Sequence, residues 1–286
     1  MKVIIISDIK SERKSIIPYG LNLGKHNETK VEIVHMIDPR THQGVSSPYS
    51  DSQSITPGNK LSQDELFNRE KNLVGRGLDK LLSAEASRLN YPLKYETRIL
   101  VDSVDQGLKN IFSEYKEEIC VTSLVPDHSM IANLSELMGI FDRVEVPLLI
   151  VPPGFKFREL ADIIVVTDYS KESHDPVSQA LQWFRSFPLT IRAIDITDLN
   201  NIAEEEDNRD LWEATVNDFI TQSMNLNTKI LIGDRERETI LEQIIKREAD
   251  IVMLPKELFR KSQYKLKKES VRTEFFKVLA VPVILF

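Results

Sequence analysis

Two aspartates stand where a ligand could be bound. Asp8 ends the apolar run 1–8 and Asp168 ends the apolar run 162–168, and each directly follows a hydroxyl residue. Runs that are apolar at every position predict strands covered on both faces, as in a parallel sheet. The carboxyl end of such a strand borders the crevice in which open α/β sheets bind ligands. Asp8 and Asp168 are therefore either ligand-binding carboxylates or caps of the turns that follow them.

A second group of residues could bind an anion. Six lysines and arginines lie between residues 256 and 268, among them Lys256 and Lys261. Side-chain cations of this kind could hold a phosphorylated metabolite or an acidic partner surface. A solvated basic loop is the alternative.

Motifs for catalysis are missing from the sequence. The five histidines are scattered without metal-ligand spacing, and neither a nucleophile elbow nor a phosphate-binding P-loop occurs. Asp127 and His128 are the one neighbouring pair worth testing as acid and base, but no nucleophile accompanies them. We therefore expect neither an enzyme nor a metal site.

The elements that must position these residues are repeated along the chain. Five apolar runs occur in each half in the same order, and the third run is nearly identical in the two halves. Matched landmarks in matched order indicate a duplicated unit. The pairs are 1–8 and 162–168, 31–38 and 189–195, 97–101 and 228–232, 118–122 and 250–254, and 146–151 and 281–285.

Helical patterns separate the runs. Residues 62–65 form a capping box before a long apolar stripe that includes Leu73, Val74 and Leu78. Pro176 marks the start of the first helix of the second half. Strands alternating with helices predict two α/β domains, each a doubly wound five-stranded parallel sheet.

We place the first domain at residues 1–152, a short linker at 153–157 and the second domain at 158–286. The short linker predicts two sheets lying against each other, and one continuous sheet would count against this interpretation. About 25 extra residues separate the second and fourth runs of the first half, much of them in 39–61. We expect that segment, rich in Ser, Pro and Gly, to be an exposed loop.

Composition limits the possible functions. The 286 residues are 41% hydrophobic and 28% charged, with a net charge of −7, which argues against nucleic acid as a partner. No apolar run approaches the roughly 20 residues that span a membrane. The single cysteine, Cys120, is expected to be a buried thiol in a reducing compartment. We therefore expect a cytoplasmic protein.

Several short motifs point to a known family. In each half an aspartate closes the first run, an acidic residue begins the fourth and Val-Pro opens the fifth, while Val34-His35-Met36 lies near the end of the second run of the first half. With its unit of about 140 residues, a usual domain size, the chain resembles the universal stress protein (UspA) family in its tandem form. The resemblance covers nearly the whole sequence.

The resemblance implies a fold and a role. The fold is the adenine nucleotide alpha hydrolase-like one, with strand order 3-2-1-4-5 in each domain and pairing through the last strands, residues 148–151 and 283–286. Such pairing would occur within the chain or between two copies. The implied role lies in stress response or regulation, through protein partners and without an agreed reaction.

ATP-binding members of the family carry Gly-x2-Gly-x9-Gly-Ser/Thr after the fourth strand, where glycines let main-chain amides approach phosphates. Residues 123–135 and 254–270 contain no glycine, so the motif is degenerate in both halves. We expect no cofactor, and ATP or AMP is disfavoured. With the basic loop included, the candidate ligand-binding residues are Asp8, Val34, Ser123, Ser135, Asp168, Lys256, Lys261 and Ser270.

Two functions from different classes remain. The first is a non-enzymatic universal stress protein-like role through protein contacts. The second is a sensor that still binds an adenine nucleotide or another anionic ligand at one of the two crevices. A weak nucleotide hydrolase is a third and less favoured hypothesis.

Overall fold

The computed structural model describes most of the chain in separate stretches. They are residues 2–7, 15–37, 63–92, 94–102, 104–113, 119–122, 147–152, 154–170, 174–197, 202–232, 249–255 and 281–286. The predicted loop at 39–61 lies outside them.

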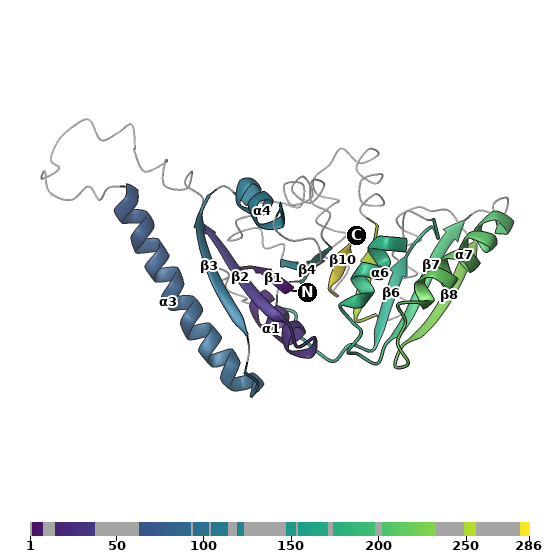
Figure 1. The fold of residues 1–286 in the computed structure, drawn as a ribbon, viewed down its shortest axis with the longest axis horizontal. Coiled ribbons are helices and arrows are strands. Elements are labelled where there is room, and N and C mark those ends of the chain that lie inside the picture. Colours follow the sequence, from purple (N-terminus) through teal and green to yellow (C-terminus); the bar gives the residue numbers. More distant parts are fainter. Residues whose placement is uncertain are drawn as a thin grey trace, which may run out of the picture.

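All ten predicted runs are strands, and each half builds a five-stranded parallel arrangement (Figure 1). In the first half the sheet order is β3-β2-β1-β4-β5, and in the second it is β10-β9-β6-β7-β8. The strand order 3-2-1-4-5 therefore occurs twice. The strands are β1 (Lys2–Ile6), β2 (Lys30–Ile37), β3 (Tyr95–Val101), β4 (Ile119–Thr122), β5 (Leu148–Ile150), β6 (Asp162–Val166), β7 (Thr190–Thr197), β8 (Asn225–Ile232), β9 (Ile251–Leu254) and β10 (Val283–Leu285).

The two halves form one sheet. Strand β5 pairs with β10 in antiparallel fashion, with Leu149 opposite Ile284, so ten strands are continuous. The expectation that two sheets lie against each other is wrong, because the last strands join edge to edge, whereas the pairing of the last strands that the resemblance implied is confirmed within the chain. Continuity does not remove the repeat, since each half keeps its own parallel order and the direction reverses only at this joint.

The helices are α1 (Ile16–His26), α3 (Gln63–Leu89), α4 (Val104–Ser113), α6 (His174–Gln182) and α7 (Ile202–Asn217). The capping box predicts α3, whose buried face carries Val74 and Leu78. Leu73, predicted on the same stripe, is 56% exposed, so that assignment is wrong. Figure 1 shows α3 outside β3, at one end of the molecule.

The inner strands of both halves are buried, whereas β3 and β8 at the two ends of the sheet are partly exposed. A Cβ added to Gly20 of α1 would lie 2.5 Å from Ile5 Cδ1, so glycine allows α1 to approach β1 closely. Cys120 in β4 is fully buried, as predicted, and burial raises the pKa of its thiol. The thiol is therefore a packed side chain and not a reactive one.

Ion pairs at the amino ends of the strands repeat with reversed charge. Lys2 of β1 pairs with Glu32 of β2, and Asp162 of β6 pairs with Arg192 of β7. Lys2 and Asp162 each begin the first strand of their half, and their partners lie 30 residues further on. The duplicated scaffold thus keeps the pairing while the two charges have changed places.

An aromatic seam joins the halves on the side of α1. The ring of His26 stacks on Phe157 of the linking segment and on Phe187 after α6, with centroid distances of 5.4 and 4.7 Å. Tyr19 contacts Phe157 edge-on at 5.1 Å. The buried carboxylate of Asp250 accepts hydrogen bonds from the main-chain N–H groups of residues 161 and 162. These contacts fix the segment between the halves.

Among the described residues, no helix combines the length and the apolar character needed to cross a membrane.

Candidate functional site

The crevices lie where the strand order reverses. In the two halves this is beside β1 and β4, and beside β6 and β9, at the carboxyl ends of the strands. Two of the predicted site residues, Val34 and Asp168, belong to the described part of the chain. The others lie outside it: Asp8, Ser123, Ser135, Lys256, Lys261 and Ser270.

Val34 is fully buried inside β2. Its carbonyl accepts a hydrogen bond from Ser7 N–H at 2.7 Å, and in the second half Ile194 accepts one from Thr167 N–H at 3.0 Å. In both halves the residue that follows the first strand is thus still hydrogen-bonded to the second strand. The side chain of Val34 is closed to a ligand, and its carbonyl already has a donor.

Asp168 is exposed in a turn that its neighbours hold rigid. Thr167 Oγ1 accepts a hydrogen bond from Tyr169 N–H at 3.0 Å, and Asp168 Oδ1 accepts one from Ser170 N–H at 3.0 Å. Each bond joins a side chain to the main chain two residues on, which is how hydroxyl and acidic residues stabilise turns. The turn-capping role proposed for Asp168 is therefore present, while its second oxygen has capacity left.

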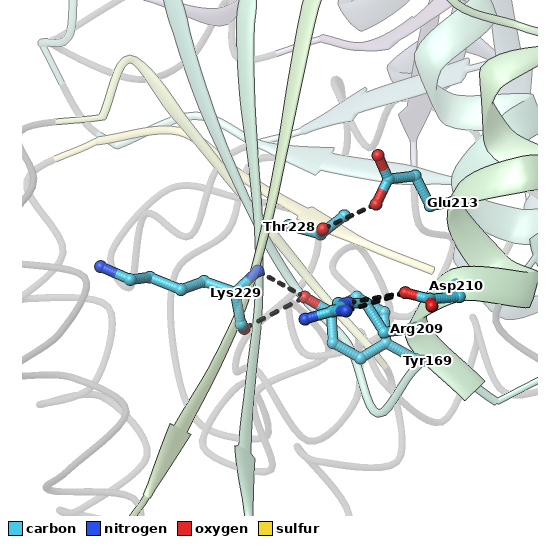
Figure 2. A network of polar contacts seen from close by, with 6 residues as sticks. All are labelled: Tyr169, Arg209, Asp210, Glu213, Thr228 and Lys229. Atoms are coloured by element: carbon cyan, nitrogen blue, oxygen red, sulfur yellow. Dashed lines mark hydrogen bonds and ion pairs between the residues drawn. The ribbon is translucent and has the colours of Figure 1, made fainter. Parts of the chain in front are cut away.

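Tyr169 anchors this turn. Its φ of 52° lies in the left-handed region, which bulky residues rarely adopt. Its side chain is buried. The phenolic oxygen lies 2.9 Å from Ala193 O and 3.1 Å from Lys229 O, and it accepts a hydrogen bond from Lys229 N–H at 3.0 Å (Figure 2). With one hydrogen, the hydroxyl donates to one of the two carbonyls at a time.

Helix α7 covers the tyrosine. The ring of Trp212 meets the ring of Tyr169 edge-on at 5.3 Å. Beside them Thr228 Oγ1 donates a hydrogen bond to Glu213 Oε2 at 2.8 Å, and Arg209 pairs with Asp210 at 2.8 Å (Figure 2). Burial, above all, raises the pKa of Tyr169, so the phenol stays protonated and continues to donate at neutral pH.

The chemical capacity of this arrangement is limited. A fixed, exposed carboxylate can accept hydrogen bonds from the hydroxyl or amino groups of a ligand. Within the described residues, no three histidine, cysteine or acidic side chains are grouped so that they could hold a metal ion. The geometry therefore leaves the Asp168 carboxylate able to accept hydrogen bonds.

No local pattern marks Tyr169, and the sequence reasoning missed it. Its hydrogen-bond partners lie 24 and 60 residues away in the sequence, on two strands whose packing only the fold defines.

Comparison with solved structures gives the fold its family context. A universal stress protein from Archaeoglobus fulgidus aligns with 12% identity and a TM-score of 0.53, over 99% of this chain and 95% of that one. A Pseudomonas aeruginosa protein provisionally named a universal stress protein aligns with 11% identity and a TM-score of 0.54, over 100% and 92% of the two chains. The fold is the universal stress protein fold. It extends over both halves, which confirms the predicted fold in tandem form.

A functionally unknown protein from Pseudomonas aeruginosa also aligns, with 10% identity and a TM-score of 0.52 over 100% of this chain and 92% of that one. No family model matches the sequence, and none of the curated proteins matches it. The likeness is therefore one of structure.

Proposed function

We propose that this protein is a non-enzymatic regulator of the universal stress protein type, acting in stress response through contacts with other proteins. The fold over the whole chain supports the class, and the loss of the glycine pattern in both halves supports weak or absent nucleotide binding.

The turn at the end of β6 carries this proposal. The Thr167 hydroxyl and the N–H groups of Tyr169 and Ser170 are used within the turn, and Asp168 is exposed there. A phosphate approaching this point meets a like charge, and residues 254–270, which follow the fourth strand of this half, lack the glycines whose amides an ATP-binding member of the family would offer. The crevice of the second half therefore favours a protein that works without bound ATP.

Thermal unfolding with and without ATP and Mg²⁺ tests the proposal. A ligand at 100 times its dissociation constant adds about 2.7 kcal/mol of stability. For a chain of this size that corresponds to a rise in Tm of about 5 °C. We expect an unchanged Tm and no phosphate release above the buffer blank. A rise of that size, or phosphate release, contradicts the proposal.

A second candidate function is ligand sensing at Asp168. The observation that favours it is the left-handed Tyr169, because strained residues held by their surroundings often occur at binding sites. The ligand would be an adenine nucleotide, or another anion, that presents hydroxyl groups to the carboxylate. If ATP does raise the Tm, Asp168→Asn should abolish most of the rise, whereas Asp210→Asn on the surface of α7 should leave it intact.

A further inference from the structure

The chain between the two halves is held by few main-chain hydrogen bonds. We call residues 154–160 the strap; it contains no helix or strand. At its start, Gly154 N–H donates to Ser15 Oγ at 3.2 Å and Phe155 N–H donates to Pro152 O at 3.1 Å. From residue 156 to residue 160, no main-chain group is hydrogen-bonded to another described residue. A segment held in this way opens locally at a lower cost than the strands beside it.

Side chains attach the strap to α1. Phe155 and Phe157 are partly buried and pack against the core, whereas Lys156 and Arg158 are exposed. The ring of Tyr19 in α1 meets both phenylalanine rings, at centroid distances of 6.2 and 5.1 Å. Because the residues alternate in this way, an apolar side of the strap lies along the helix and a basic side faces the solvent.

The ring of His26 lies between the strap and the second half. It stacks on Phe157 with an angle of 30° between the ring planes and on Phe187 with an angle of 28°. Phe187 is fixed, because it is 2% exposed and its N–H donates to Phe184 O at 3.0 Å. Phe157 makes no such main-chain bond within the described chain. Of the two contacts of His26, the one with the strap is therefore the one that can be released.

Three stretches of the chain meet at this ring, and all three carry charges. Burial is the main cause that lowers the pKa of His26, and Lys25 lowers it further, while Glu159 of the strap raises it. A proton taken up by the docked ring thus meets an apolar contact and a neighbouring cation. The other charged residues of these stretches are Glu28 after α1, Lys156 and Arg158 in the strap, and Arg185 before Phe187; Arg158 pairs with Asp250 at 2.6 Å.

We propose that the strap is a proton-operated device: protonation of His26 releases it from α1, while the rest of the fold stays intact. The sign follows from linkage. The released ring is in water and takes up its proton at the ordinary pKa of about 6.5. Because the docked ring binds the proton less readily, acidification below that pH favours the released strap. The effect levels off once the docked ring is protonated as well.

The neighbouring contacts keep the halves joined when the strap moves. The pairing of β5 with β10 involves apolar residues that do not titrate, and Ser186 Oγ donates to Asn27 Oδ1 at 3.2 Å between the two halves. Release therefore uncovers Tyr19, which is 1% exposed, together with Phe155 and Phe157. The device gives the junction an apolar surface in acid that is covered at neutral pH.

Thiol labelling of the full chain measures the release. Leu160→Cys places a thiol at the end of the strap, where the leucine is 2% exposed, and the fully buried Cys120 reports global unfolding of the same molecule. The reagent is a pyridyl disulfide, which also reacts in acid. As the pH falls from about 7.5 to 5.5, position 160 should be labelled increasingly faster in Leu160→Cys than in Leu160→Cys/His26→Phe. The ratio of the two rates should rise about tenfold for each unit that separates the pKa of the docked ring from 6.5, and Cys120 should stay unlabelled.

Glu159→Gln in the same background is the matched variant. The carboxylate of Glu159 favours the charged ring, so its removal should move the midpoint of the change in the ratio to lower pH. A purely structural effect of residue 26 moves no midpoint. A ratio that is constant with pH, a midpoint that moves to higher pH, or labelling of Cys120 as fast as that of position 160 overturns the proposal.

NMR of the unsubstituted protein gives an independent measurement if a cysteine variant folds poorly. His26 is one of five histidines, and His26→Phe identifies its ring resonances. Its pKa should lie below 6.5, and the nuclear Overhauser effect between His26 and Phe157 should weaken as the ring is protonated, while that between Tyr169 and Trp212 persists. A pKa at or above 6.5 means that the phenyl rings attract the charged imidazole and tighten the strap, which contradicts the proposal.

Discussion

Two buried tyrosines show that the hydrogen-bond partners of a hydroxyl group determine its effect on stability. Tyr19 and Tyr169 are each 1% exposed, and burial is the main cause that raises the pKa of both phenols. The hydroxyl of Tyr169 bonds to the main chains of β7 and β8, whereas no hydrogen-bond partner for that of Tyr19 lies among the described residues. A buried polar group without a partner costs stability, and a partnered one does not.

Replacing each tyrosine by phenylalanine should therefore have opposite effects. Tyr169→Phe leaves a main-chain N–H and a carbonyl without their partner and should lower the free energy of unfolding by about 1 to 2 kcal/mol. Tyr19→Phe removes only an unsatisfied oxygen and should leave stability unchanged or raise it. Urea denaturation of the two variants beside the parent protein measures both effects. An equal loss of stability in both variants would show that the hydroxyl groups act through the packing of the rings and not through hydrogen bonds.

His26 gives the seam between the halves a dependence on pH. Its burial between Phe157 and Phe187 lowers the pKa of the imidazole, Lys25 lowers it further, and Glu159 opposes them. The unfolded chain therefore takes up this proton first as the pH falls through about 6.5, the ordinary value. As the pH falls further, the free energy of unfolding decreases until the pH is also below the pKa of His26 in the folded protein.

Comparison of the parent protein with His26→Phe measures this contribution. Between about pH 7.5 and 5.5, where most carboxylates remain charged, the parent should lose more stability than the variant. Phenylalanine keeps the ring stacking, so the two proteins should be similar at the upper end of the range. The same loss in both would remove His26 as the cause.

At the scale of the strands, the apolar runs predict where each strand lies along the chain better than they predict which strands pair with each other. Runs that are apolar at every residue, such as 3–6 and 163–166, predict buried parallel strands, because a strand of a parallel sheet is covered on both faces. The same runs do not identify the strand with which the last strand of each half pairs. The family resemblance implied that β5 joins β10, and the structure confirms this pairing within the chain, but the Val-Pro landmarks by themselves do not encode it.

The same limit applies to the candidate site. The aspartate at the end of β6 was predictable, because strand ends in such folds face the crevice. Its fixed orientation was not, since Tyr169 reaches β8 through contacts across 60 residues. Leu73 shows the converse: helical spacing placed it on the buried stripe, but its side chain is left exposed.

The buried ion pairs provide a prediction for the sheet. The carboxylate of Glu32 is 1% exposed between Lys2 and Arg98, with Arg98 Nε 2.8 Å away. Glu32→Gln removes the charge that both cations share. It should cost about 2 to 3 kcal/mol, less than for a fully buried pair because Lys2 and Arg98 keep some contact with water.

Glu96→Gln is the matched control. Glu96 pairs with Lys30 at the surface of the neighbouring strand, with both side chains about half exposed. Surface pairs contribute little, so this change should have no measurable effect. If chemical denaturation shows that the two variants lose the same free energy of unfolding, burial does not determine how much the Glu32 ion pair contributes to stability.

At the scale of the whole molecule, the joint between β5 and β10 should make the two halves unfold together. Strand β10 is hydrogen-bonded on both sides, to β9 and to β5. Phe286 N–H donates to Leu254 O in β9, so the alternate residue Leu285 directs its N–H toward β5. Leu285→Pro therefore removes a hydrogen bond of the joint itself.

Calorimetry distinguishes one cooperative unit from two. The parent protein should unfold in a single transition with equal calorimetric and van't Hoff enthalpies, while Leu285→Pro should split the transition or unfold the second half at a lower temperature. Tyr95→Pro is the matched proline control: Lys94 O accepts from Val31 N–H, so Tyr95 directs its own N–H away from the sheet, and a single transition should remain. Two transitions in the parent protein would mean that the continuous sheet does not couple its halves.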